Sequence, residues 1–175
     1  GNIPDLAGRT VGLIGCGAIG QKVARKLSGF AVRVLGHDPF ADAAACCQAG
    51  IALTDLDSLL RESDFISLHA RLTGRNRGMI GARELSLLRP TAIMINTSRA
   101  GLVDEAALCR ALSERRILGA ALDVFEEEPL PSGHPLLALD NVTLTPHMAG
   151  GSNDAFFNTP ALLRERMKDW IARQA

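Results

Sequence analysis

The sequence predicts an α/β fold in which a doubly wound, mostly parallel sheet carries helices on both faces. Short apolar segments rich in β-branched residues alternate along the chain with segments of helical periodicity. The apolar segments are almost continuously apolar, which is typical of parallel strands that are buried on both faces. The chain has 175 residues, of which 47% are hydrophobic, so we expect one domain with its own core.

The expected strands recur along the whole chain, at residues 10–14, 31–35, 64–68, 91–95, 118–123 and 141–145. Helices are expected at residues 18–27, 83–88 and 104–115. A further helical segment at 160–175 has one apolar face, made of Leu163, Met167, Trp170 and Ile171. We interpret that face as a packing surface. The loop 126–134 is rich in proline and acidic residues, and as the longest irregular stretch it is a candidate functional loop.

Charge and cysteine usage narrow the class of protein. Lys plus Arg number 19 and Asp plus Glu number 19, so there is no basic excess for binding a nucleic acid. No apolar run approaches the roughly 20 residues of a membrane span, so we expect no membrane partner. The cysteines form no C-x-x-C pair and no metal-ligand spacing with histidine; they are Cys16, Cys46, Cys47 and Cys109. We therefore expect reduced thiols in a cytoplasmic protein, and no metal site.

A glycine motif follows the first expected strand and opens the first expected helix. It reads Gly-Cys-Gly-Ala-Ile-Gly from Gly15 to Gly20, the G-x-G-x-x-G pattern of a dinucleotide-binding Rossmann turn. Gly15 permits the tight turn, Gly17 allows a pyrophosphate to approach the backbone, and Gly20 allows the helix to pack against the strand. The helix start at Ala18 and Ile19 offers its N–H groups and positive dipole end to the phosphates.

An acidic residue at the tip of the second strand indicates which dinucleotide binds. Asp38 lies 18 residues beyond Gly20, where a carboxylate accepts hydrogen bonds from the adenosine ribose hydroxyls. Its charge would repel a 2′-phosphate, and no arginine follows it immediately. The sequence therefore predicts NAD, not NADP, as the cofactor.

Four segments, in this order, resemble the NAD-binding domain of the D-2-hydroxyacid dehydrogenases. They are residues 6–20, 96–104 (Asn-Thr-Ser-Arg-Ala-Gly-Leu-Val-Asp), 122–129 (Leu-Asp-Val-Phe-Glu-Glu-Glu-Pro) and 141–150 (Asn-Val-Thr-Leu-Thr-Pro-His-Met-Ala-Gly). That family includes phosphoglycerate, glycerate, lactate and formate dehydrogenases. The resemblance covers essentially the whole chain, so residues 1–175 are expected to form one Rossmann domain.

The resemblance implies a catalytic set of three residues. Arg99 matches the arginine that holds the substrate carboxylate and polarises the 2-oxo group, a role suited to a permanently charged, two-pronged guanidinium. His147 matches the general acid/base, because imidazole titrates near neutrality. Glu128, directly before Pro129, matches the carboxylate that hydrogen-bonds the other ring nitrogen and orients the imidazole.

The resemblance also assigns the nicotinamide end of the cofactor. Asp123 matches an aspartate near the carboxamide, and Thr97 lies where a strand end meets the ring. The remaining histidines have no matching role and are interpreted as surface or packing residues; they are His37, His69 and His134.

Two positions depart from the family pattern. Ala100 follows the arginine where the family commonly has glycine, a change that leaves the guanidinium available. Arg71 stands where the family usually has proline, two residues after the strand that ends near His69. We hypothesise that Arg71 reaches a phosphate of the cofactor.

Two classes of function remain open. In the first, the domain serves an oxidoreductase that transfers a hydride between NAD(H) and a D-2-hydroxy acid/2-oxo acid pair. The family's substrate domain is absent from this chain, so we expect it to bind NAD, to turn over little substrate and to form a homodimer. In the second, it is an NADH-sensing interaction module of the corepressor type. Neutral composition favours the enzyme. A Rossmann methyltransferase or an NADP reductase fits poorly, because neither explains the Arg–Glu–His set.

Overall fold

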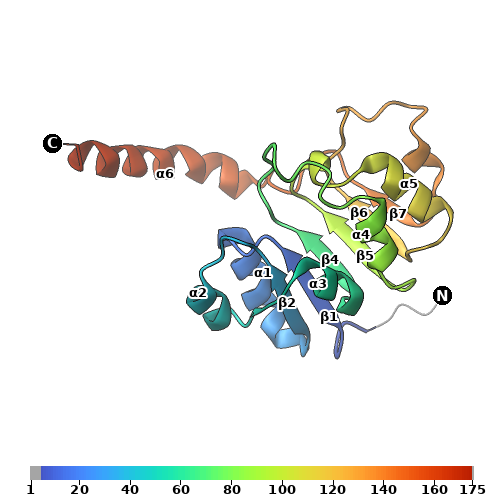
Figure 1. The fold of residues 1–175 in the computed structure, drawn as a ribbon. Coiled ribbons are helices and arrows are strands. Elements are labelled where there is room, and N and C mark those ends of the chain that lie inside the picture. The colour runs from blue at the N-terminus through green and yellow to red at the C-terminus, as the bar shows by residue number, and fades with distance from the viewer. Residues whose placement is uncertain (1–4, 175) are drawn as a thin grey trace.

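All seven strands of the sheet are parallel, in the order β3-β2-β1-β4-β5-β6-β7. The computed structural model describes residues 5–174 (Figure 1). The strands are β1 (Thr10–Ile14), β2 (Arg33–His37), β3 (Ala52–Leu53), β4 (Phe65–Leu68), β5 (Ile93–Asn96), β6 (Gly119–Leu122) and β7 (Val142–Leu144). The chain extends from β1 first in one direction and then, from β4 onward, in the other, which confirms the doubly wound prediction.

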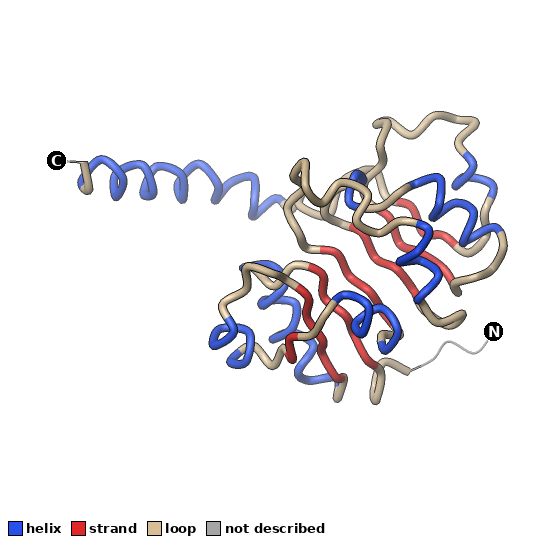
Figure 2. The backbone as a smooth tube through the Cα atoms, viewed as in Figure 1, coloured by secondary structure: helices blue, strands red, loops and turns tan. Residues whose placement is uncertain are grey.

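The α-helices are α1 (Ala18–Leu27), α2 (Ala43–Gln48), α3 (Leu56–Glu62), α4 (Ala82–Leu87), α5 (Glu105–Ser113) and α6 (Asn153–Ala172). Three short 3-10 segments accompany them, η1 (Ser28–Phe30), η2 (Ala100–Leu102) and η3 (Pro135–Ala138). In Figure 2, short helices lie on either side of the sheet, close to the strands that they connect.

Two consecutive residues of β1 show how the two faces are covered. Leu13 belongs to a buried cluster with Ala24 of α1 and Cys46 of α2. Its neighbour Ile14 belongs to a second, larger cluster with Leu59 of α3. Because successive side chains of a strand point to opposite faces, α1 and α2 cover one face and α3 covers the other. The helices on both faces are therefore as predicted.

The predicted bounds differ from the structure mainly where the chain turns. Residues 10–14 and 18–27 form a strand and a helix as predicted, but β2 starts two residues later than expected. Ala31 adopts a left-handed conformation (φ 53°) after η1, which delays entry into the strand. The pattern missed β3 and α3, and it missed α2, whose sequence Ala-Ala-Ala-Cys-Cys-Gln has no apolar periodicity. Its start is instead set by Asp42, whose side chain accepts hydrogen bonds from Ala44 N and Ala45 N.

Helix α6 extends away from the sheet (Figure 1). Its apolar side chains are more than half exposed: Leu163, Met167, Trp170 and Ile171. Among the described residues this face is therefore not buried, and its interpretation as a packing surface stays a prediction. Among the described residues, no helix has both the length and the apolar composition needed to cross a membrane.

Candidate active site

Each glycine of the turn after β1 has a distinct steric environment. Gly15 has φ +97°, and a Cβ there would lie 2.5 Å from Ala70 N. A Cβ on Gly20 would lie 2.3 Å from the carbonyl oxygen of Gly15. A Cβ on Gly17 would meet nothing within 4 Å. The fold itself thus requires glycine at positions 15 and 20, whereas position 17 faces open space into which a ligand can come close.

The start of α1 leaves a row of backbone donors. The first hydrogen bond into the helix runs from Gln21 N to Gly17 O, at 3.0 Å. Within the described residues, no hydrogen bond is made by the N–H groups of Gly17, Ala18, Ile19 and Gly20. Four such donors at a positive helix end match the requirements of a pyrophosphate.

Asp38 lies against the same turn. Its Oδ2 accepts a hydrogen bond from Cys16 N at 2.9 Å, and its Oδ1 accepts one from Phe40 N at 2.9 Å. The amide of Cys16 is therefore taken by the protein, and the donors available to a ligand begin at Gly17. A carboxylate has about four acceptor positions, so these two bonds leave room for ribose hydroxyls.

A cavity of about 860 Å³ joins the turn to the loop after β4. Gly17 and Asp38 line one side, and Arg71, Arg75 and Asn76 line another. The volume, the backbone donors and the acidic strand tip fit a bound dinucleotide. Arg71 lies on this cavity, as its hypothesised phosphate contact requires.

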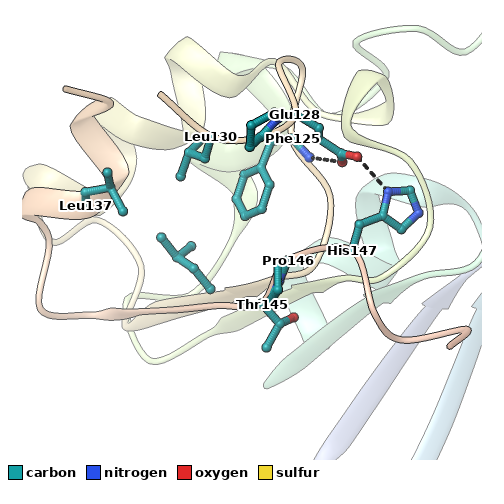
Figure 3. A pocket seen from close by; sticks show the side chains of 9 residues that line it. Phe125, Glu128, Leu130, Leu137, Thr145, Pro146 and His147 are labelled. Atoms are coloured by element: carbon teal, nitrogen blue, oxygen red, sulfur yellow. Dashed lines mark hydrogen bonds and ion pairs between the residues drawn. The ribbon is translucent and has the colours of Figure 1, made fainter. Parts of the chain in front are cut away.

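The structure brings Glu128 and His147 together from two different loops (Figure 3). His147 Nδ1 lies 2.8 Å from Glu128 Oε2, while Glu128 Oε1 accepts a hydrogen bond from Phe125 N at 3.0 Å. The hydrogen bond to His147 and that from Phe125 hold the pKa of Glu128 below its usual value. The carboxylate is therefore ionised near neutrality, and it fixes the orientation of the imidazole.

The second nitrogen of His147 is available for proton exchange. It lies on the far side of the ring from Glu128 (Figure 3), and it has no hydrogen-bond partner in the part of the chain that the structure describes. Behind the pair is a largely apolar cavity of about 520 Å³, lined by Phe125, Leu130 and Leu137 among others. The pair therefore has one apolar side and one side that is open to a reactant.

Asp123 anchors the loop that carries His147. It is 3% exposed, and it accepts hydrogen bonds from Thr145 Oγ1 at 2.5 Å, Met148 N at 2.9 Å and Ala149 N at 2.9 Å. Burial alone would raise the pKa of Asp123, but these hydrogen bonds outweigh it and lower the pKa. This anchoring role was missed by sequence reasoning, and the contact of Asp123 with nicotinamide stays a prediction.

Arg99 lies in the loop after β5, and the side chain of Asn96 holds this loop by two hydrogen bonds. Asn96 is 2% exposed; its Oδ1 accepts from Ser98 N at 3.0 Å, and its Nδ2 donates to Arg99 O at 3.0 Å. The Arg99 side chain is exposed and donates from Nη1 to Ser98 O at 2.6 Å. Thr97 is also exposed. The sequence motif contained Asn96 but gave no reason to select it.

Sheet register places the loops of the three candidate catalytic residues at one edge. Asn96 at the end of β5 pairs with Leu122 of β6, which pairs with Leu144 of β7. All three strands end there, so the loops with Arg99, Glu128 and His147 emerge side by side. Ala100 begins η2, the 3-10 segment that directly follows Arg99.

The three histidines without a family role lie in different surroundings. His37 and His69 line the cavity of about 860 Å³. Burial lowers the pKa of His69, whose Nε2 is buried with no hydrogen-bond partner among the described residues. His134 Nε2 lies 3.0 Å from Glu105 Oε1. Among the described residues, no cluster of three or more His, Cys, Asp or Glu side chains has the arrangement of a metal site.

Comparison with known proteins identifies a family. Residues 2–149 match the sequence profile described as "D-isomer specific 2-hydroxyacid dehydrogenase, NAD binding domain". A glyoxylate reductase from Korarchaeum cryptofilum is 44% identical over 168 residues, which are 96% of this chain and 48% of that protein. The chain thus spans about half the length of this curated relative.

Solved structures agree with the sequence match. A D-lactate dehydrogenase with NAD⁺ from Lactobacillus jensenii has a TM-score of 0.82 and 33% identity, covering 89% of this chain and 50% of that one. An acyclic imino acid reductase in complex with NADPH and D-Arg has a TM-score of 0.87 and 34% identity, covering 97% of this chain and 53% of that one. The match extends over nearly the whole of this chain in sequence and in fold.

Proposed function

Because this chain belongs to the D-isomer specific 2-hydroxyacid dehydrogenase family, as its NAD-binding domain, we propose that the whole protein interconverts a D-2-hydroxy acid and a 2-oxo acid. The observation that carries the proposal is the contact between Glu128 and His147, which holds one imidazole nitrogen and leaves the other for a substrate. The substrate would be a small 2-hydroxy or 2-oxo acid.

In the oxidation direction, His147 Nε2 takes the proton of the substrate hydroxyl, and Glu128 stabilises the imidazolium that results. Arg99 binds the substrate carboxylate through parallel N–H groups and polarises the oxygen on C2. NAD, when bound, would supply the acceptor for the hydride that leaves C2 with both bonding electrons. In the reduction direction His147 returns its proton to the 2-oxo oxygen, so the same three side chains serve both directions.

The cofactor would lie between the glycine turn and the loop after β4. Gly17, Ala18, Ile19 and Gly20 would hold the pyrophosphate by their backbone N–H groups, and Asp38 would hold the ribose hydroxyls. Thr97 and Asp123 would lie at the nicotinamide end. Asp38 disfavours NADP, because its charge would lie against a 2′-phosphate.

Arg71 would contribute a phosphate contact that the family pattern lacks. Its position on the cofactor cavity supports this role. If the contact forms, Arg71→Ala weakens NADH binding and reduces its dependence on salt. NADH affinity and salt dependence equal to those of the original chain would exclude the contact.

Residues 1–175 would supply one of two domains. Arg99 and Glu128 are both exposed at the sheet edge, which is consistent with a site completed by a second domain. We therefore expect this chain to bind NADH and to show little turnover alone. A homodimer and a cytoplasmic location are further parts of the proposal, supported by zero net charge and four free cysteines.

Two measurements test the proposal. Calorimetry of this chain with NADH should give saturable binding, and NADH absorbance should fall when the full-length protein meets a 2-oxo acid from a panel of different side chains. A constant absorbance with every acid, despite NADH binding, would instead favour the corepressor-type sensor. The comparisons give that alternative no support at present, since the relatives described above are enzymes.

A further inference from the structure

The loop that carries Glu128 is attached at two points to one side chain. Glu105 Oε1 lies 3.0 Å from His134 Nε2, and Glu105 Oε2 accepts a hydrogen bond from Glu126 N at 3.4 Å. Residues 126 and 134 are the two ends of the segment that contains Glu128. One carboxylate therefore closes this irregular segment into a loop.

Glu105 is well suited to hold a loop, because its own backbone is rigid. It is the first residue of α5, directly after the N-cap Asp104, whose Oδ1 accepts a hydrogen bond from Ala107 N at 2.9 Å. Leu108 and Leu112 of the same helix are buried in the larger core cluster. The Glu105 side chain thus projects from a helix that the core holds in place.

The partner His134 has a defined hydrogen-bonding arrangement. Leu136 N donates to His134 Nδ1 at 3.3 Å, so that the ring proton lies on Nε2 and is donated to Glu105. The side chains of His134 and Glu105 are only 16% and 24% exposed. Competition from water is therefore reduced, and the hydrogen bond to an ionised acceptor is of the stronger kind.

Leu130 packs against the larger core cluster, but the other polar attachments of the segment are weaker or depend on Glu128 itself. Arg77 pairs with Glu126 at 3.2 Å, but these side chains are 60% and 46% exposed, and exposed ion pairs contribute little. The remaining contacts of Glu128 are those with Phe125 N and His147. Without Glu105, the segment gains conformations in which Glu128 does not reach His147.

We propose that Glu105 and His134 are positioning residues, which close the segment 126–134 and so hold the Glu128 carboxylate against His147. The positioning of Glu128 is inferred from the contacts described above, whereas its consequence for catalysis rests on the proposed function. Neither residue touches the substrate or the cofactor in this assignment. Both act through Glu128, whose carboxylate faces His147 in Figure 3.

The test compares Glu105→Ala and His134→Asn with the original chain. Asparagine is a favoured N-cap residue, so His134→Asn keeps an acceptor for Leu136 N at the start of η3, but its side chain is too short to reach Glu105. Carbon-13 NMR of the labelled Glu128 carboxyl reports its titration. We expect the pKa of Glu128 to rise toward its usual value in both variants, and the double variant to show no more than Glu105→Ala alone, which already removes both attachments.

A matched control removes a different surface carboxylate. Glu62→Ala breaks an exposed ion pair with Arg33, at 2.7 Å, on the opposite end of the sheet, and should leave the Glu128 titration unchanged. In the full-length protein we expect kcat to fall about tenfold in both test variants with little change in KM for NADH. If Glu105→Ala does not fold, His134→Asn decides the question.

The results separate this proposal from the proposed function. A wild-type Glu128 titration in folded His134→Asn would overturn the positioning role, whatever the enzyme does. Conversely, a shifted titration in a protein that reduces no 2-oxo acid would support the loop closure and refute the proposed reaction. A loss of thermal stability alone, with the titration unchanged, would assign Glu105 and His134 to stability only.

Discussion

His147 Nδ1 lies 2.8 Å from Glu128 Oε2, although 19 residues and one strand separate the two side chains in the sequence. The loop after β6 and the loop after β7 come together because their strands are parallel neighbours with a shared carboxyl edge. The contact orients the imidazole and keeps the carboxylate ionised. Both consequences are open to measurement.

Replacing Glu128 with glutamine should weaken acid–base catalysis without affecting cofactor binding. An amide cannot stabilise an imidazolium by charge, so kcat of the full-length protein should fall about 10- to 100-fold, while removal of the imidazole in His147→Asn should cost about 10²–10⁴-fold. Steady-state kinetics checks this order. Equal activities of Glu128→Gln and the parent enzyme would rule out a catalytic role for the carboxylate.

Gly17→Ala should separate ligand binding from folding. A methyl group there meets no protein atom within 4 Å, so the melting temperature should stay close to that of the parent chain. The methyl group would occupy the space where a pyrophosphate approaches, and NADH affinity should fall about tenfold or more. Differential scanning calorimetry and NADH titration measure the two effects.

Alanine substitutions at two other glycines serve as comparisons for Gly17→Ala. Gly29→Ala is the control, since a Cβ there also meets nothing within 4 Å but lies in η1, outside the glycine turn. Gly20→Ala should instead destabilise the fold by about 1–3 kcal/mol, because its Cβ would meet the Gly15 carbonyl at 2.3 Å. Normal NADH binding by Gly17→Ala would place the pyrophosphate elsewhere.

Asp38→Asn should relax the discrimination between the two dinucleotides. The amide oxygen retains one acceptor for Cys16 N or Phe40 N, but the negative charge that repels a 2′-phosphate is removed. We expect NADPH affinity to rise about tenfold relative to NADH, which corresponds to about 1.4 kcal/mol. Parallel titrations with both cofactors measure the ratio of NADPH affinity to NADH affinity. An unchanged ratio would show that Asp38 does not discriminate between the two cofactors at the ribose.

Asp123→Asn should lower stability in a pH-dependent way. Asparagine cannot accept all three hydrogen bonds that the Asp123 carboxylate receives. The free energy of unfolding at pH 7 should therefore be about 1–3 kcal/mol lower in Asp123→Asn than in the parent. Because the pKa of Asp123 is lowered below 3.8 by folding, ionisation stabilises the protein above that value. This contribution is lost as the pH falls through the lowered pKa. The difference in free energy of unfolding between the parent and Asp123→Asn, measured by urea unfolding, should therefore shrink below about pH 3.8. A difference that stays constant across this pH range would contradict the assignment.

The sequence motifs selected the residues of the glycine turn, because glycine spacing and strand periodicity are local properties of a chain, whereas the family resemblance selected Arg99, Glu128 and His147 as candidate catalytic residues. They did not reveal Asn96 or Glu105, whose roles depend on what each side chain meets. Asn96 binds the loop of Arg99, and Glu105 binds a residue 29 positions away. Side chains of this kind look like ordinary polar residues until their partners are known.

The sequence by itself determined the α/β class, the strand followed by a glycine turn at Gly15–Gly20, and the acidic tip at Asp38, since these depend on neighbouring residues and on backbone preferences. Only the tertiary structure decided which donors at that turn stay available, because Asp38 takes the amide of Cys16. It also decided that Asp123 anchors the His147 loop. The physical reason is that hydrogen bonds between loops depend on strand order and register, which bring together residues that no local pattern connects.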